Sequence, residues 1–169
     1  MVLATLRKLK KMSVAQSDNV AIYTLNSEEE TAALAARLAR HLQPGDVLLL
    51  SGDLGAGKSV FARALIRALT GKSDLEVPSP TFTLVQTYDT PAGPLWHFDL
   101  YRLEEPEEIY ELGWEDALYE GIVIVEWPQR LGGLAPADHI GLGLELSAKD
   151  QNQRRASLTL NARLEGTKI

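Results

Sequence analysis

The chain has 169 residues, of which 45% are hydrophobic and 24% are charged, and these values are typical of one globular domain with a sizeable buried core. It contains no cysteine, which excludes disulfide bonds, thiolate-bound zinc and a thiol nucleophile. The formal net charge of -6 argues against a free-standing nucleic-acid binder, because such proteins gain affinity from Lys and Arg side chains on phosphates.

The start of the sequence, MVLATLRKLKKM, is basic but lacks the apolar stretch that follows the charges of a signal peptide. No apolar run in the chain approaches the roughly 18 residues of a membrane span. We therefore expect residues 1–19 to form a flexible N-terminal extension and residues 20–169 to form one domain without membrane contact. The first twelve residues are interpreted as a solvated tail or an over-extended start, with a partner-binding basic arm as the alternative.

A helix is predicted after Ser27, because Ser27 and Glu30 have the spacing of a capping box. Leucines then recur at every fourth position until the QPG stretch at 43–45, which ends the helix. The next segment, DVLLLS, is an unbroken apolar run typical of a strand buried on both faces. A second helix is expected to end at Gly71, because apolar residues repeat along one of its faces up to this glycine.

The second half of the chain contains more strand patterns. TFTLVQTYDT and PLWHFDLYR alternate polar and apolar residues around a PAG turn and predict a β-hairpin. A helix is expected from Pro106 to Glu120, because proline suits the first helical turn. GIVIVEWP predicts a buried strand, and HIGLGLELS and RASLTLNA predict a terminal antiparallel hairpin. The sequence therefore predicts an α/β protein with a mixed central β-sheet flanked by helices.

The stretch GDLGAGKS lies between the predicted buried strand and the second helix. Gly52, Gly57, Lys58 and Ser59 complete the pattern G-x-x-x-x-G-K-[ST] of a P-loop. Glycines allow successive backbone amides to point inward around phosphates, and the start of the following helix adds a positive dipole. In this pattern the lysine reaches the β- and γ-phosphate oxygens, and the serine hydroxyl is a ligand of Mg²⁺. The sequence therefore predicts a P-loop NTPase-like nucleotide site.

A P-loop site also needs an acidic side chain that holds or orients the metal, and two candidates compete. Asp99 shares one face of a predicted strand with Leu95 and His97. Glu126 ends the IVIVE strand, at the carboxyl edge where α/β proteins bind ligands. Taken singly, either carboxylate is also compatible with a solvated surface position. With the P-loop present, we expect both near the γ-phosphate, one on Mg²⁺ and the other orienting the attacking water.

Three further features have both a structural and a functional interpretation. PSPTFT is either a rigid loop or a switch segment that offers Thr81 to the γ-phosphate or the metal, with Thr81 and Thr83 exposed on alternate strand positions. His97 is either a base or a satisfied core residue. Trp127 is either packed in the core or in contact with the nucleotide or a partner.

Four blocks, GDLGAGKS, SPTFTLV, HFDLYRL and IVEWP, resemble in their order and spacing those of the TsaE family, whose older name is YjeE. The similarity covers roughly residues 20–160 and leaves out the N-terminal segment. The aspartate inside the P-loop, the HFDLYR block and the Glu-Trp pair make the resemblance specific, because P-loop proteins in general do not share them. Ser59 stands where threonine is common in the family, which preserves the metal-binding oxygen.

The resemblance implies a bacterial cytoplasmic ATPase, using ATP and Mg²⁺, that is needed for the threonylcarbamoyladenosine modification of tRNAs reading codons that begin with A. It implies work with the TsaB and TsaD subunits, with TsaD performing the transfer and tRNA touching this subunit weakly or indirectly. By motif, catalytic roles fall to Lys58, Asp99 and Glu126, and metal binding to Ser59 and Glu126. The expected nucleotide contacts are Ser27, Asp53, Leu54, Gly55, Ala56, Gly57, Lys58, Ser59, Val60 and Thr81.

Two other functions remain open from the residues. A small P-loop kinase would need an arginine-bearing lid over the phosphates, whereas Arg63 and Arg67 lie on the helix after the P-loop. No arginine finger is evident, and Arg102 and Arg130 are the candidates for one. A non-catalytic nucleotide-binding scaffold would require both acidic candidates to be structural.

Overall fold

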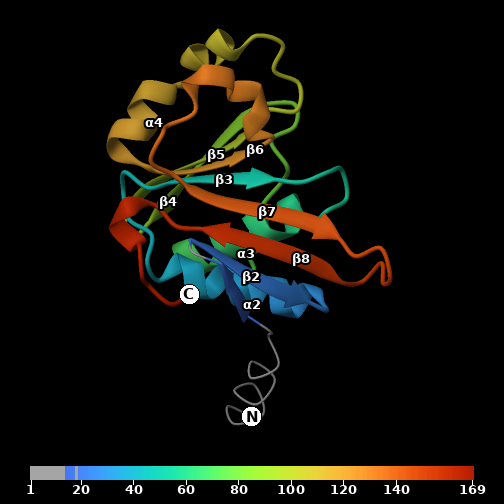
Figure 1. The fold of residues 1–169 in the computed structure, drawn as a ribbon. Coiled ribbons are helices and arrows are strands. Elements are labelled where there is room, and N and C mark those ends of the chain that lie inside the picture. The colour runs from blue at the N-terminus through green and yellow to red at the C-terminus, as the bar shows by residue number, and fades with distance from the viewer. Residues whose placement is uncertain (1–13, 18) are drawn as a thin grey trace.

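The computed structural model describes residues 14–17 and 19–169, which form one β-sheet with helices on both faces (Figure 1). The rest of the expected N-terminal extension, residues 1–13 and 18, lies outside this description, and the domain boundary at residue 20 stays a prediction. The strands are β1 (Val14–Ser17), β2 (Val20–Leu25), β3 (Val47–Ser51), β4 (Val85–Thr90), β5 (Gly93–Asp99), β6 (Ile122–Glu126), β7 (Ile140–Leu146) and β8 (Arg154–Thr159). The α-helices are α2 (Glu28–Ala39), α3 (Lys58–Thr70) and α4 (Trp114–Glu120), and the 3-10 helices are η2 (Pro106–Leu112), η3 (Pro128–Leu134) and η4 (Ala162–Leu164).

The strands of the described residues make one eight-stranded sheet in the order β1-β2-β8-β7-β3-β6-β5-β4. β7, β3, β6 and β5 run parallel at its centre, and antiparallel pairs complete both edges. The predicted mixed sheet is therefore confirmed, and so are the hairpins β4–β5 and β7–β8. β1 and β2, which the sequence pattern did not indicate, pair with each other and extend the sheet beyond β8.

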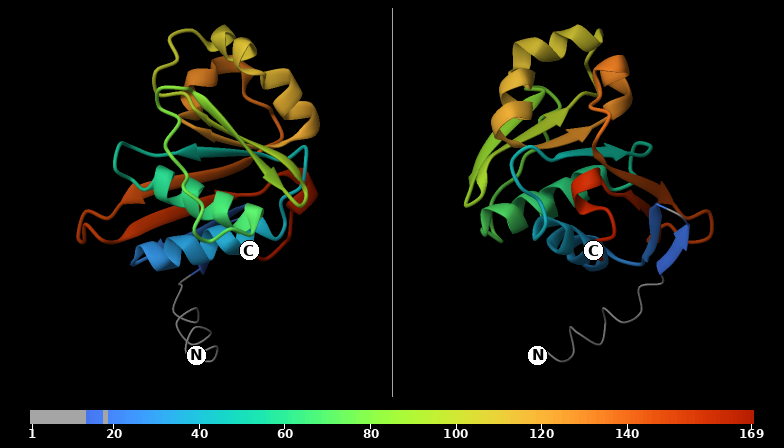
Figure 2. Two further views of the ribbon diagram at one scale, coloured as in Figure 1. Left: turned by 180° about the vertical axis from the view of Figure 1, so that it is seen from behind. Right: turned by 60° about the vertical axis from the view of Figure 1, so that its left-hand side comes forward.

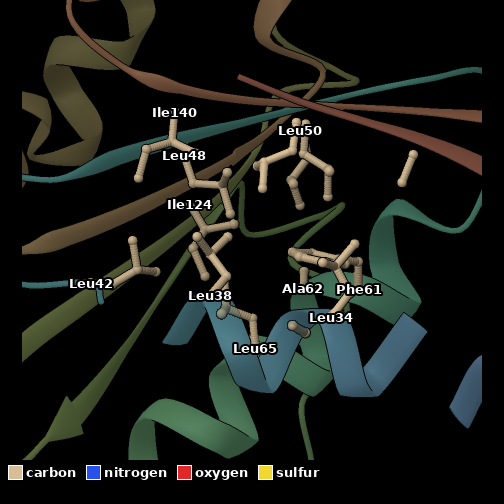
Figure 3. Close-up of a cluster of buried hydrophobic side chains, with 14 of the residues drawn as sticks. Leu34, Leu38, Leu42, Leu48, Leu50, Phe61, Ala62, Leu65, Ile124 and Ile140 are labelled. Atoms are coloured by element: carbon tan, nitrogen blue, oxygen red, sulfur yellow. The ribbon is translucent and has the colours of Figure 1, made fainter. Parts of the chain in front are cut away.

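α2 and α3 pack against one face of the sheet and enclose the larger of its two hydrophobic clusters. Figure 3 shows Leu34 and Leu38 of α2, and Phe61 and Leu65 of α3, gathered under the strands. All four side chains are buried and meet the apolar residues of β3, β6 and β7. Burial of the apolar stripe of α3 fixes the helix beneath β3, and this fixes the loop that joins the two elements.

η2, α4 and η3 cover the opposite face of the sheet over β3, β5 and β6 (Figure 2). Trp114 of α4 packs edge-on against Phe98 of β5, with ring centroids 5.3 Å apart. The single helix predicted from Pro106 to Glu120 is wrong, because Gly113 divides this segment into η2 and α4. Gly113 has a φ of +83°, and a Cβ there would lie 2.9 Å from the Trp96 ring, so the packing requires glycine.

The start of α2 is capped almost as predicted. Ser27 Oγ accepts a hydrogen bond from the Glu30 amide at 3.2 Å, whereas the Glu30 carboxylate accepts from the amide of Asn26 rather than from that of Ser27. The helix ends at Ala39, before the QPG stretch, and Leu42 is buried beyond its end. The periodic leucines therefore located the buried face but overstated the length of the helix. None of the helices in the described part of the chain is long and apolar enough to span a membrane.

A buried carboxylate fastens the C-terminal segment to the start of β3. Asp46, which directly precedes β3, is 4% exposed. Its oxygens accept hydrogen bonds from Asn161 Nδ2 at 2.9 Å and from Arg163 Nε at 3.1 Å, and they form an ion pair with Arg163 Nη2. The Gln43 amide donates a further hydrogen bond at 2.9 Å. These four residues, named here the Asp46 clamp, lie at the end of β3 opposite to the P-loop.

Candidate functional site

The P-loop connects the carboxyl end of β3 to the start of α3. Gly52, Gly55 and Gly57 have φ values of +143°, +82° and +106°, a region that other residues rarely adopt. A Cβ on Gly52 would also collide with the backbone carbonyl oxygen of Leu144 in β7. α3 begins at Lys58 without a side-chain cap, so no capping side chain uses the amides of its first turn. A glycine-rich loop that leads into such a helix start is suited to bind an anion.

The expected nucleotide contacts of the loop differ in exposure. Asp53, Leu54 and Gly55 are exposed at its tip, Leu54 with 78% of its surface, whereas Ala56 is buried. Val60 is half-buried in the first turn of α3. The loop therefore presents its tip to solvent while its base is packed against the sheet.

Lys58 is 5% exposed and is held by the loop that precedes it. Its Nζ donates hydrogen bonds to the carbonyl oxygen of Gly52 at 2.6 Å and to that of Asp53 at 2.9 Å. Burial lowers the pKa of Lys58 from its ordinary value of 10.5, and nearby carboxylates, above all those of Glu126 and Asp99, offset part of this effect. The ammonium group is therefore poorly hydrated, and an anionic ligand would stabilise its charge.

Ser59 and Glu126, the two expected metal-binding residues, are in direct contact. Ser59 Oγ donates a hydrogen bond to Glu126 Oε2 at 3.1 Å. Glu126 is the last residue of β6, beside β3, and is 1% exposed. Its other oxygen, Oε1, lies 2.9 Å from His97 Nε2. The fold therefore brings the P-loop hydroxyl and a buried carboxylate together from separate parts of the chain.

Asp99 lies next to Glu126, because the two residues are partners in the parallel pairing of β5 with β6. Asp99 Oδ2 accepts hydrogen bonds from Ser79 Oγ at 3.3 Å and from Thr81 Oγ1 at 3.2 Å. Asp99 Oδ1 accepts from the Tyr101 amide at 3.0 Å. The two carboxylates thus have different partners: Glu126 contacts the P-loop serine, and Asp99 contacts the hydroxyls of the PSPTFT segment. Ser79 had no signal of its own in the sequence.

The PSPTFT segment ends in a turn. β4 begins at Val85, so the prediction that Thr81 and Thr83 occupy strand positions is wrong. Thr83 is exposed as expected, whereas Thr81 is half-buried. Leu84 has a φ of +65°, unusual for a residue other than glycine, at the point where the turn enters the strand. The turn directs the Thr81 hydroxyl to Asp99 instead of outward.

Trp127 follows Glu126 with a φ of +59°, which turns the chain sharply after β6. The centroid of its ring lies 4.0 Å from Lys58 Nζ and 4.9 Å from the Tyr101 ring. The residue is half-buried and also packs against the cluster under η2 and α4. Of the two interpretations of Trp127, the structure combines packing at the core edge with a cation–π contact to the P-loop lysine.

Arg154, at the start of β8, contacts the P-loop and has no motif that signals it. Its Nε donates to the carbonyl oxygen of Ala56 at 3.1 Å, and its Nη1 donates to the carbonyl of Gln151. Because the C=O and N–H groups of a trans peptide point in opposite directions, the bond to Ala56 also fixes the direction of the Gly57 amide. Arg154 thus ties the β7–β8 hairpin to the P-loop.

Ser27, the remaining expected nucleotide contact, lies at the start of α2. The adjacent Asn26 accepts a hydrogen bond from Gln153 Nε2 at 2.9 Å. Gln153 directly precedes Arg154, which contacts the P-loop. The β7–β8 hairpin therefore links the two segments that are expected to bind the nucleotide.

The two arginine-finger candidates, Arg102 and Arg130, make contacts with residues outside the P-loop. Arg102 stacks on the Phe82 ring, with its guanidinium carbon 4.4 Å from the centroid. Arg130 Nη1 donates to the carbonyl of Leu103 at 3.4 Å. The structure therefore assigns the P-loop contact to Arg154 and not to either of them.

A magnesium ion at this site would need water molecules or phosphate oxygens as ligands in addition to the protein side chains. Among the described residues, no group of three or more acidic, His or Cys side chains is gathered closely enough to hold a metal ion. Ser59 and Glu126 fit Mg²⁺, because it prefers oxygen ligands and usually keeps water and substrate phosphates in its coordination shell.

Strand, loop and helix thus bring a lysine, a serine and two carboxylates to one edge of a parallel sheet, where α/β proteins bind ligands. This arrangement defines the class: an α/β protein of the P-loop NTPase type.

Comparison with known proteins identifies the family. The sequence model of the family described as "Threonylcarbamoyl adenosine biosynthesis protein TsaE" matches residues 25–156. The chain belongs to the TsaE family.

Individual relatives agree with this assignment. The tRNA threonylcarbamoyladenosine biosynthesis protein TsaE of Rickettsia conorii is 46% identical over 140 residues, which cover 83% of this chain and 78% of that one. The protein of the same name from Aquifex aeolicus is 41% identical over 134 residues, covering 79% and 92%. The crystal structure of Bacillus subtilis YdiB superposes with a TM-score of 0.69 at 26% identity, covering 89% of this chain and 92% of that one.

Proposed function

We propose that the chain binds ATP together with Mg²⁺ and hydrolyses it. The observation that carries the proposal is the contact between Ser59 and Glu126, which joins the first turn of α3 to the adjacent strand beside the buried Lys58. A hydroxyl and a carboxylate at this point of a P-loop are suitable ligands for Mg²⁺. The uncapped start of α3 and the glycine-rich loop supply amides for the phosphates.

The position of each side chain suggests its role in this reaction. Lys58 and the loop amides bind and orient the phosphates, and Ser59 and Glu126 hold the metal. Mg²⁺, when bound, supplies positive charge that stabilises the phosphate oxygens during transfer. Asp99 orients the attacking water and, through Thr81, positions the PSPTFT segment beside the phosphates.

We further propose that this activity serves the threonylcarbamoyladenosine modification of tRNA in the cytoplasm, together with TsaB and TsaD. Exposed Leu54, Phe82 and Tyr101, on the P-loop and the segments beside it, are suited to contact a protein partner. The net charge of -6 is consistent with tRNA being held mainly by those partners. Hydrolysis by the isolated chain is expected to be slow, because the site is completed when a partner covers it.

Phosphate release tests both parts of the proposal. It is measured with ATP and Mg²⁺ for the isolated chain, then with TsaB and TsaD, and then with tRNA added. Lys58→Ala should lower the rate in the assembly by roughly 100-fold or more, because it removes a preorganised positive charge. Lys72→Ala, at an exposed lysine just beyond α3, is the matched control and should release phosphate as the wild type does.

The outcomes separate the two parts. Unchanged release by Lys58→Ala contradicts the P-loop mechanism. A wild-type rate that is already maximal without the partners contradicts their role in completing the site.

A further inference from the structure

His97 is the third residue of a buried polar chain that begins at the P-loop. It lies on β5 and is 2% exposed, on the same face of the sheet as Leu95 and Asp99. Its Nε2 lies 2.9 Å from Glu126 Oε1, and Glu126 Oε2 in turn accepts the Ser59 hydroxyl. One carboxylate thus connects the imidazole to the hydroxyl, each through a different oxygen.

The other nitrogen of the ring determines where its hydrogen lies. Within the described part of the chain, His97 Nδ1 is buried and has no hydrogen-bond partner. A hydrogen on Nδ1 would be a donor without an acceptor in the core, which costs more than leaving an acceptor nitrogen unpaired. Nε2 therefore carries the hydrogen that the imidazole donates to Glu126.

This arrangement also excludes a role for His97 as a base. Its Nε2 is occupied by the bond to Glu126, and its Nδ1 is enclosed by the core. Neither nitrogen can reach a proton of a substrate or of a water molecule at the P-loop. The ring can act on the reaction only through the carboxylate that it contacts.

We propose that His97 is a positioning residue that fixes the orientation of the Glu126 carboxylate. The imidazole holds Oε1, so that Oε2 is directed to Ser59 and to the Mg²⁺ ion that the pair would bind. This inference rests on the function proposed above and extends it to a residue that touches neither metal nor nucleotide. Loss of such an outer contact typically lowers metal affinity by 10- to 100-fold.

Binding measurements test the proposal without depending on turnover. The Mg²⁺ dependence of binding a non-hydrolysable ATP analogue is measured by calorimetry for His97→Leu and His97→Met, which remove the donor, and for His97→Gln, which keeps an N–H donor. The donor-free variants should need at least roughly 10-fold more Mg²⁺ for the same binding of the analogue, whereas the Mg²⁺ requirement of His97→Gln should stay close to that of the wild type. Leu95→Met, on the same face of β5, controls for a change in core volume and should behave as the wild type.

A double-mutant cycle shows whether His97 acts through Glu126. In a Glu126→Gln background, His97→Leu should cause no further increase in the Mg²⁺ requirement. The proposal is overturned if a folded donor-free variant keeps the wild-type Mg²⁺ requirement, or if His97→Gln raises that requirement as much as His97→Leu does. It is also overturned if His97→Leu still raises the requirement in the Glu126→Gln background. A wild-type chain that binds the analogue without any effect of Mg²⁺ would contradict the proposed function itself.

Discussion

Two buried carboxylates at opposite ends of the parallel strands differ in the partners that they have. Asp46, before β3, receives a guanidinium, a side-chain amide and a backbone amide in the Asp46 clamp. Glu126, at the end of β6, receives a hydroxyl and an imidazole. Both are almost fully buried, so solvent does not account for the difference.

The comparison separates a structural carboxylate from one that can bind a cation. The charge of Asp46 is compensated within the chain by Arg163, and its oxygens are occupied by strong donors. Neither of the groups hydrogen-bonded to Glu126 is a guanidinium or an ammonium, so its carboxylate remains available to Lys58 and to a metal ion. A buried carboxylate that no Lys or Arg side chain in the described part of the chain contacts directly, beside a P-loop, is therefore where we expect a cation to bind.

The largest expected effect is on stability at the clamp. Asp46→Ala should lower the free energy of unfolding by about 3 kcal/mol, because it leaves the donors of Asn161 and Arg163 without their acceptor. Urea unfolding measures this change. Glu145→Ala is the control. Glu145 forms an ion pair with Arg155 at 3.4 Å, and both side chains are exposed, so the loss of this pair should lower the free energy of unfolding by less than about 1 kcal/mol. Equal losses in the two variants would show that the clamp is no more important than a surface pair.

Glu126→Gln should have the opposite signature. Turnover in the TsaB–TsaD assembly should fall by about 100-fold, or about 2.7 kcal/mol of barrier, because the metal loses a charged ligand. The free energy of unfolding should change less than for Asp46→Ala, because the amide keeps an acceptor oxygen for its neighbours and no Lys or Arg side chain of the described residues is hydrogen-bonded to Glu126. Phosphate release and urea unfolding are measured on the same preparation. A loss of stability as large as that of Asp46→Ala would assign Glu126 to the structure.

Asp99→Asn should have a smaller effect. The amide keeps an acceptor for the Tyr101 amide but weakens the bonds from Ser79 and Thr81, because a charged acceptor becomes neutral. Turnover should fall by about 10-fold, the equivalent of the roughly 1.4 kcal/mol lost when the charged acceptor becomes neutral, and hydrogen exchange across PSPTFT should become faster. Exchange at the wild-type rate would show that Asp99 does not hold this segment.

The smallest expected effect is at Arg154. Arg154→Ala should weaken binding of a non-hydrolysable ATP analogue by about 3-fold, because the peptide between Ala56 and Gly57 loses a neutral-acceptor hydrogen bond. Arg155→Ala, at the exposed neighbouring position, is the matched control and should bind the analogue normally. Calorimetry on both variants gives the comparison. Equal affinities would mean that the loop keeps its shape without Arg154.

The sequence predicted those parts of the site that depend on local pattern. The P-loop residues are adjacent in the chain, Glu126 ends an apolar strand, and Asp99 shares a strand face with His97, so their approach to one site could be inferred. Arg154 could not be found in this way, because its contact with Ala56 joins residues 98 positions apart. Nothing in the sequence around Ser79 indicates its hydrogen bond to Asp99, because this contact depends on the turn that follows the serine.

The errors in the fold have the same origin. Gly113 interrupts a segment with good helical pattern because the Trp96 ring, on a strand, occupies the space of a side chain. The helix pattern reports which residues face the core, and it does not report which neighbour approaches the backbone. Such contacts follow from the packing of distant segments, which a single sequence does not display.

The first glycine of the P-loop shows that even a sequence motif depends on the packing of a distant segment. The carbonyl oxygen of Leu144 in β7 fills the place where Gly52 would carry a side chain. The motif is therefore shaped by a neighbouring strand as much as by the phosphates that it is suited to hold. A protein designer who transplanted the loop with β3 and α3 alone would lose this constraint, so β7 has to be moved with it as part of the same unit.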